Sequence, residues 1–306
     1  MEKLEWVEQE YVDLKDTTFM IPLRIETQDR MRNAITILTY LLRGFNTNVM
    51  VLENDSNPTF KENVLPVLEQ SVPAFNLKNL NYMYEETEEY MFHRTRMLND
   101  MTMKADTDIV VNYDTDILLP KNVYSQACQV IRDGTASFVY PYGMGNYQFQ
   151  VQASDEQVTE FINSNFNFLA FTNKRQWDAK FGFVQFCDRE EYIRLGMEIE
   201  DFKAYGYEDD ERFQRFSRLS KVYRIDDMVW HLEHERTSNS WFNNPHIESN
   251  KKLYEKLIKL KPKELLKYCQ TQQYMKDRCI IGGEYEDPTE IDPEIYEAMW
   301  EETLIG

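Results

Sequence analysis

The first 120 residues alternate between apolar runs of strand length and segments whose apolar residues recur at helical spacing. Runs of aliphatic and aromatic residues occur at 17–25, 48–55, 80–86 and 108–120. The segments between them repeat apolar residues every three or four positions, which is typical of amphipathic helices. Strands separated by such helices form βαβ units, so the pattern predicts an α/β fold with a mostly parallel central sheet and flanking helices.

The helices expected between these strands cover about residues 31–44, 58–70 and 91–105. The first of them stops at a glycine, a residue that commonly follows the end of a helix. The middle of the chain is rich in aromatic residues, and there we expect two more strands at 137–143 and 165–171.

We expect one large domain over residues 1–255, because 306 residues suffice for one α/β domain with an appendage. The composition then changes: residues 250–278 are rich in lysine, whereas 283–306 carry many acids and no Lys or Arg. Residues 256–306 are therefore predicted to form a C-terminal helical extension and an acidic tail.

The net charge of −19 argues against nucleic acid as a partner, because Lys and Arg must neutralise the phosphates of a bound nucleic acid. No apolar run approaches the roughly 18 residues that a membrane-spanning helix needs, and the first residues do not resemble a signal peptide. The four cysteines show no CxxC spacing, as expected of free thiols in a reducing compartment. We expect a cytoplasmic protein without an integral membrane segment, which a partner could still recruit to a membrane.

Three of the four predicted strands end in acidic residues: Glu53 and Asp55, Glu85 and Glu86, Asp114 and Asp116. Ligands of parallel sheets bind beyond the carboxyl ends of the strands. In an extended chain the carboxylates of Asp114 and Asp116 point to the same side. They are either a solvated turn or oxygen ligands for a divalent cation that could bridge the phosphates of a substrate.

Two further segments carry polar groups, and each group has either a structural or a functional role. In "YGYEDDERFQRF" (205–216), the aromatic residues predict a helix whose first turn holds four acids. Acids there either complement the helix dipole or serve a cation or a substrate hydroxyl. In "MVWHLEHER", His231 ends an apolar strand and is either a core residue or a nitrogen ligand. The dinucleotide motif GxGxxG, the P-loop and GxSxG are all missing.

Five short motifs in this order resemble those of GT-A glycosyltransferases, closest to the β-1,4-galactosyltransferases and the bacterial chondroitin-polymerase-like enzymes. The resemblance covers roughly residues 18–255. "IPLR" is similar to the family's IPFR, "FHRTRMLN" to FNRAKLLN, "DTD" to DVD or DCD, "YGYEDDERFQRF" to WGGEDDDIFNRL, and "MVWH" to MIRH.

The resemblance implies a donor side and a metal site. Donor-binding residues would be Pro22, Arg24, Glu53, Arg94 and Asp114, with Glu53 facing the uracil. The metal, Mn²⁺ or Mg²⁺, would bind Asp116, His231 and Met228. His234 is the second choice as a ligand, because in an extended strand it would face away from His231.

The resemblance also implies an acceptor side. Asp209 would be the catalytic base, Glu208 would act beside it by binding acceptor hydroxyls, and Tyr205 and Asp210 would also contact the acceptor. Glu211 is expected only to complement the helix dipole. The implied reaction is metal-dependent, inverting transfer of a hexose or N-acetylhexosamine from a UDP-sugar to a glycan hydroxyl. A retaining transferase and a non-catalytic glycan-binding or scaffold protein are the alternatives.

One departure from the family concerns the glycine pair that precedes the acceptor loop. Here Gly182 stands alone in "KFGF", and residues 168–171 are bulky. The identity of the donor sugar therefore cannot be transferred from the family to this chain.

Overall fold

The computed structural model describes residues 12–177, 181–237 and 243–279. Its centre is a seven-stranded sheet in the order β10-β6-β9-β4-β1-β2-β3, in which only β9 runs antiparallel to its neighbours. The strands are β1 (Val12–Leu23), β2 (Phe45–Asp55), β3 (Leu80–Glu86), β4 (Ile109–Tyr113), β6 (Phe138–Tyr140), β9 (Val184–Asp188) and β10 (Val222–Arg224).

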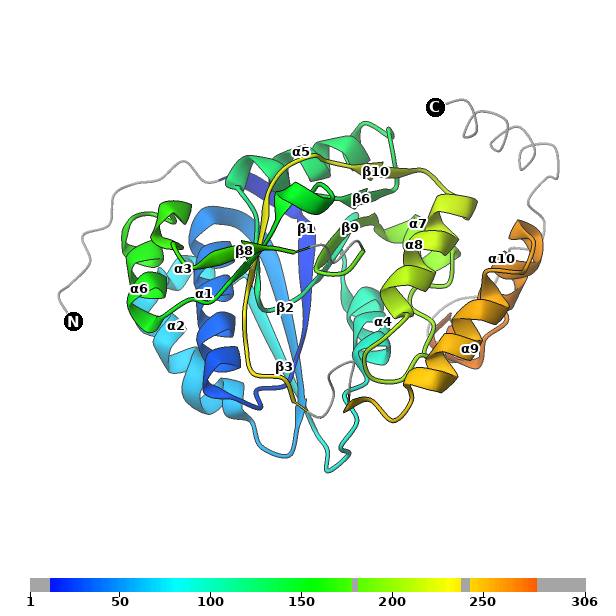
Figure 1. Ribbon diagram of the computed structural model, residues 1–306, viewed down its shortest axis with the longest axis horizontal. Helices are drawn as coiled ribbons and strands as arrows, with labels where there is room; N and C mark the ends of the chain where they lie inside the picture. Colours follow the sequence, from blue (N-terminus) through cyan, green and yellow to red (C-terminus); the bar gives the residue numbers. More distant parts are fainter. Residues whose placement is uncertain (1–11, 178–180, 238–242, 280–306) are drawn as a thin grey trace.

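Helices cover both faces of this sheet, as Figure 1 shows. The helices are α1 (Gln28–Gly44), α2 (Leu65–Ser71), α3 (Ala74–Leu77), α4 (Arg94–Lys104), α5 (Lys121–Arg132), α6 (Asp155–Asn163), α7 (Arg189–Arg194), α8 (Glu208–Leu219), α9 (Ile247–Leu257), α10 (Pro262–Gln270) and α11 (Gln273–Cys279). Short π and 3₁₀ turns lie at Phe60–Val64, Gly145–Tyr147 and Phe168–Ala170.

Alternation along β1 divides the core into two layers. Phe19 and Ile21 pack with apolar residues of α1 and α5, whereas Met20 packs with those of α4, α7 and α8. Successive side chains of a strand point to opposite faces, so one strand serves both layers. The expected fold class, a mostly parallel sheet flanked by helices, is confirmed.

Two of the expected strands differ from the structure. The run 108–120 is split into β4 and the short β5 (Ile117–Leu118), with a turn over the acids between them. The strand expected at 165–171 is wrong: a 3₁₀ turn lies there instead. Asn165 and Phe166 have positive φ angles of 59° and 66°, a conformation that does not occur within a regular strand.

A second, four-stranded sheet brings distant segments beside the end of β4. Its order is β5-β11-β7-β8, with β11 at Val229–Leu232, β7 at Gln148–Val151 and β8 at Lys174–Gln176. In the antiparallel pair of β5 and β11, His231 lies opposite Ile117. The amide of Leu232 also donates a hydrogen bond of 2.7 Å to the carbonyl oxygen of Asp116.

The C-terminal helices pack on the same layer as α8. Leu257, Leu265 and Leu266 are buried with Phe216 and other residues of that layer. The expected domain boundary after residue 255 falls inside α9, and the predicted acidic tail lies outside the described residues. Across the part of the chain that the structure describes, no helix combines the length and apolar character needed to span a bilayer.

Candidate active site

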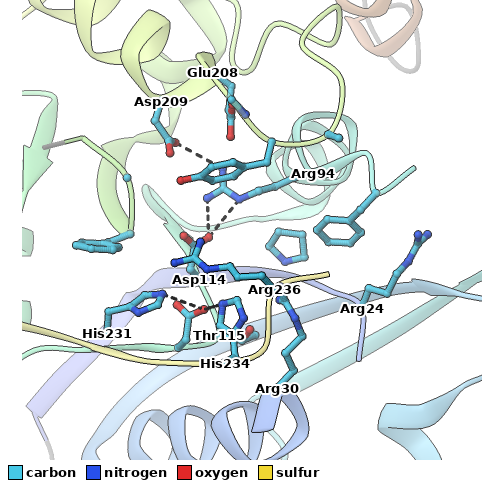
Figure 2. A pocket seen from close by; sticks show the side chains of 18 of the residues that line it. Arg24, Arg30, Arg94, Asp114, Thr115, Glu208, Asp209, His231, His234 and Arg236 are labelled. Carbon is cyan, nitrogen blue, oxygen red and sulfur yellow. Dashed lines mark hydrogen bonds and ion pairs between the residues drawn. The ribbon is translucent and has the colours of Figure 1, made fainter. Parts of the chain in front are cut away.

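A pocket of about 370 Å³ opens at the carboxyl ends of β1 and β4, between the first turn of α8 and the end of β11. Figure 2 shows its side chains from close by. It brings together most of the predicted site residues: Pro22, Arg24, Arg94, Asp114, Asp116, Tyr205, Glu208, Asp209, Asp210, His231 and His234. Residues far apart in the sequence therefore share one cavity, as the strand-end pattern predicts.

Asp116 forms a cluster with two histidines. Its Oδ2 lies 3.6 Å from Nε2 of His231 and 3.2 Å from Nε2 of His234. One ligand atom from each of the three residues lies within 4.8 Å of the others. The expectation that His234 faces away from His231 is wrong, because β11 ends at Leu232 and the chain then bends back toward Asp116.

The surroundings of Asp116 favour its charged form. Burial alone would raise the pKa of Asp116, but the adjacent His231 and His234 hold it well below its usual range. Nδ1 of His231 lies 3.0 Å from the Glu233 carboxylate, which leaves Nε2 turned to the cluster. One carboxylate and two imidazoles are a ligand set that can hold a divalent cation.

The structure does not bring Met228 and Glu53 to the pocket. Met228 is 44% exposed and is not one of the residues that line the cavity. Glu53 is buried, and its carboxylate accepts hydrogen bonds from the Phe60 amide at 2.8 Å and the Tyr82 hydroxyl at 2.6 Å. Both carboxylate oxygens of Glu53 are therefore hydrogen-bonded within the protein. Burial raises the pKa of Glu53.

Arg94 and Arg24 line the pocket and are fixed by neighbouring oxygens. Arg94 donates to Asp114 at 2.8 Å and lies 3.8 Å from Asp209 on its other side. One buried nitrogen of its guanidinium, Nη1, makes no hydrogen bond. Arg24 is held by the carbonyl and side-chain oxygens of Asn54, at 2.7 and 2.9 Å.

The four acids of the first turn of α8 have different surroundings. Glu208 is 3% exposed, and its carboxylate accepts a hydrogen bond of 2.5 Å from the Gly206 amide. Burial, and then the charge of Asp209, raise the pKa of Glu208 to about 8. Asp209, by contrast, accepts a hydrogen bond from Arg212 and lies near Arg94. The two neighbouring carboxyls therefore differ in their partners: a backbone amide donates to Glu208, whereas a guanidinium donates to Asp209.

The raised pKa of Glu208 predicts a pH-dependent stability. The native state binds this proton more tightly than the unfolded chain, so its contribution to the free energy of unfolding is present below about pH 4.5 and is lost as the pH rises to about 8. Glu208→Gln keeps a neutral side chain. In urea unfolding between pH 5 and 9, the stability of the variant relative to wild type should rise with pH and level off above pH 8. A pH-independent difference would contradict this assignment.

Glu211 is not a solvated dipole charge. It is 2% exposed, and its carboxylate accepts two hydrogen bonds from Arg215, at 2.8 and 3.1 Å. Arg215 also donates to the carbonyl oxygens of Leu195 and Met197. The expectation for Glu211 is therefore wrong, because it belongs to a buried ion pair that ties α8 to the segment after α7.

Removing the charge of Glu211 should accordingly cost much of the protein's stability. Glu211→Gln leaves the Arg215 guanidinium buried without a counter-charge, which costs about 3–5 kcal/mol in comparable buried pairs. The midpoint of urea unfolding reports the loss. The exposed helical residue Glu160 supplies the control, since Glu160→Gln should change stability by less than about 0.5 kcal/mol. Equal midpoints for the two variants would contradict the buried pair.

Sequence reasoning missed several residues that line or support the pocket: Arg30, Phe181, Phe183, Arg212 and Arg236. Arg30 stands in the first turn of α1, where no motif marks it. Gly182 was singled out only as a departure from the family. A Cβ atom at this position would lie 3.0 Å from Oδ2 of Asp209, so the missing side chain leaves room for that carboxylate.

Comparisons with known proteins support the fold. No protein-family model and no curated protein sequence matched the chain. Among solved structures it is similar to S. aureus TarS in complex with UDP-GlcNAc, at 12% identity and a TM-score of 0.53, over 82% of this chain and 70% of that one. At this identity the likeness shows the fold alone. Together with the layer order and the pocket at the strand ends, it shows that the chain has the GT-A glycosyltransferase fold.

Two further similar structures carry glycosyltransferase names at lower scores. The catalytic domain of Drosophila β1,4-galactosyltransferase 7, in complex with xylobiose, matches at 15% identity and a TM-score of 0.41, over 80% of this chain and 79% of that one. The mannosyltransferase PcManGT from Pyrobaculum calidifontis, in complex with GDP-Man and Mn²⁺, matches at 15% identity and 0.47, over 97% and 83%.

Proposed function

We propose that this chain is a glycosyltransferase that moves a hexose or N-acetylhexosamine from a UDP-sugar to a glycan hydroxyl with inversion. The observation that carries the proposal is the set of side chains that line one pocket. A cluster of one carboxylate and two imidazoles lies on one side, and the paired carboxyls of Glu208 and Asp209 lie on the other, with Arg94 and Asp114 between them (Figure 2).

The donor is bound at the strand ends. Asp116, His231 and His234 hold the divalent cation, and Pro22, Arg24 and Arg94 border the nucleotide. When bound, the cation supplies positive charge that offsets the charge developing on the departing UDP. The choice of UDP rests on the resemblance of the motifs at Pro22 and Arg94, and the choice of Mn²⁺ rests on the resemblance of the motifs at Asp116 and His231.

The acceptor is bound at the first turn of α8. Tyr205 is 45% exposed and offers an aromatic face to a sugar ring. Asp209 accepts the proton of the acceptor hydroxyl while that oxygen attacks the anomeric carbon from the face opposite to UDP. The new glycosidic C–O bond forms as the bond to the diphosphate oxygen breaks. Glu208, neutral near pH 7, donates a hydrogen bond to a neighbouring acceptor oxygen, and Asp210 lies beside it.

Incubation with a panel of nucleotide sugars and Mn²⁺ tests this function. Slow release of UDP from one donor, accelerated by the correct glycan, is the expected result. NMR of the product separates inversion from retention by the configuration of the new anomeric centre. If no donor binds and none is hydrolysed or transferred with either Mn²⁺ or Mg²⁺, the protein is a non-catalytic member of the fold.

A further inference from the structure

A buried ion pair lies behind Asp209 and outside the predicted set of site residues. One guanidinium nitrogen of Arg212 donates to both carboxylate oxygens of Glu198, at 2.9 and 3.0 Å. The other terminal nitrogen donates to Oδ1 of Asp209. Glu198 and Arg212 are buried, and neither is among the residues that line the pocket, so they act on the acceptor only through Asp209.

Glu198 is itself fixed by several elements. Its carboxylate accepts hydrogen bonds from the hydroxyl of Tyr192 at 2.7 Å and from the side-chain amide of Asn112 at 3.2 Å. Its backbone amide donates to the side chain of Asn99 at 2.8 Å. Asn99 lies on α4, Asn112 on β4 and Tyr192 on α7, so the position of Glu198 is set by the folded core.

Fold stability does not require such a pair. Two charges taken out of water cost several kcal/mol each, and apolar residues of similar size often stabilise a core as well or better. The GT-A motif that this segment resembles, WGGEDDDIFNRL, has isoleucine where this chain has Arg212. The arginine is therefore a departure from that motif, and it reaches the carboxyl proposed as the base.

We propose that Arg212, anchored by Glu198, is a positioning residue that aims the Asp209 carboxylate into the pocket. Among the described residues Arg212 is the hydrogen-bond donor to Asp209, whereas Arg94 approaches it only to 3.8 Å. Adjacent carboxyls with different surroundings take different roles in acid–base chemistry. The inference rests on the proposed function.

The other charged and titratable groups near Asp209 do not substitute for this contact. They are Arg94 from α4, Asp114 after β4, Glu208 on α8, Tyr140 and Tyr142 from the segment of β6, and Tyr205 before α8. Arg94 is already bonded to Asp114, and the remaining groups are acids or phenols. Among the described groups around Asp209, only Arg212 combines a positive charge with a hydrogen bond to it.

The test is a kinetic cycle that combines Arg212→Gln with Asp209→Asn. Arg212→Gln should lower kcat by about 10–100-fold, the scale that misplacement of a catalytic group produces, with the dissociation constant of UDP and Mn²⁺ unchanged. In the Asp209→Asn background, the same change should lower kcat by less than about twofold, because the group it positions is gone. Arg212→Lys keeps the charge but cannot hold both carboxylates with a planar fork, so its kcat should be intermediate.

Two further variants keep the test decisive. If Arg212→Gln fails to fold, the double change Glu198→Gln with Arg212→Met removes both buried charges and should give the same loss of kcat. Arg218→Gln, on the same helix but directed to the carbonyl oxygens of Ile258 and Leu260, is the control with unchanged kcat. A full loss of kcat that persists in the Asp209→Asn background would overturn the proposal.

The outcome also separates this inference from the proposed function. Suppose that wild type transfers sugar, and that this transfer is lost in the Asp209 variant but unchanged in the Arg212 variant. That result would overturn the inference and would still support the proposed function. If wild type transfers no sugar, the proposed function fails, and crystal structures of the folded variants still decide whether Arg212 places Asp209. A carboxylate of Asp209 that keeps its position without Arg212 would overturn the inference by this second measurement.

Discussion

Asp209→Asn should lower the rate of sugar transfer by about 10²–10⁴-fold while the protein still binds UDP-sugar and metal normally. This is the usual range for the loss of a general base. Asparagine keeps the shape of the side chain and an oxygen that accepts the hydrogen bond from Arg212, but it cannot take the acceptor's proton at neutral pH. Initial rates at saturating donor, with calorimetry of UDP binding in parallel, measure the two quantities separately.

The matched control for this change is Asp226→Asn, an exposed residue that does not line the pocket. Glu211→Gln is unsuitable as a control, because its effect on folding would mask any effect on chemistry. Comparable rates for the Asp209 and Asp226 variants would remove Asp209 from the mechanism. A loss of UDP binding in the Asp209 variant would instead point to a role in binding the donor.

Asp116→Ala should abolish the contribution of the metal to UDP binding. The reason is that Asp116 is the only carboxylate of the described three-residue cluster, and its negative charge is what attracts a divalent cation between two imidazoles. Calorimetry of wild type should show tighter UDP binding with Mn²⁺ than without it, and the variant should show no difference between the two titrations.

Single replacements of His231 and His234 by Ala extend this experiment. Both histidines approach Asp116 to within 3.6 Å, so each replacement should weaken the Mn²⁺ dependence. An unchanged dependence for one of them would reduce the cluster to two ligands. If wild-type UDP affinity is the same with and without Mn²⁺, the cluster does not serve a metal that binds the nucleotide.

The spacing of apolar residues along the sequence predicted the strands and helices that bear the pocket. The alternation of strands and helices placed β1 to β4, and the helical spacing of Phe213, Phe216 and Leu219 placed α8. Because ligands of parallel sheets bind at the carboxyl ends of the strands, the acids after β4 were also predicted at the ligand-binding edge. Local pattern and tertiary structure agree in these segments, so sequence alone was sufficient.

The parts that sequence did not predict depend on contacts between distant segments. The burial of Glu53 depends on Tyr82 from the neighbouring strand, and that of Glu211 depends on Arg215 and the carbonyl oxygens after α7. His234 reaches Asp116 only because the chain turns after β11. A local pattern of residue types does not indicate which distant residues are in contact. It also does not distinguish a buried charged side chain from a solvated one.

The pairing of β5 with β11 has a consequence for how the cluster assembles. β5 has only two residues, and their register places His231 opposite Ile117, next to Asp116. A slip of one residue would turn the imidazole to the other face of the small sheet, so the cluster needs this register. A cation that binds the cluster therefore also stabilises the closed pairing against local opening. Amide hydrogen exchange at Leu232, whose N–H bonds to the Asp116 carbonyl, reports that opening directly and should slow in proportion to cation occupancy.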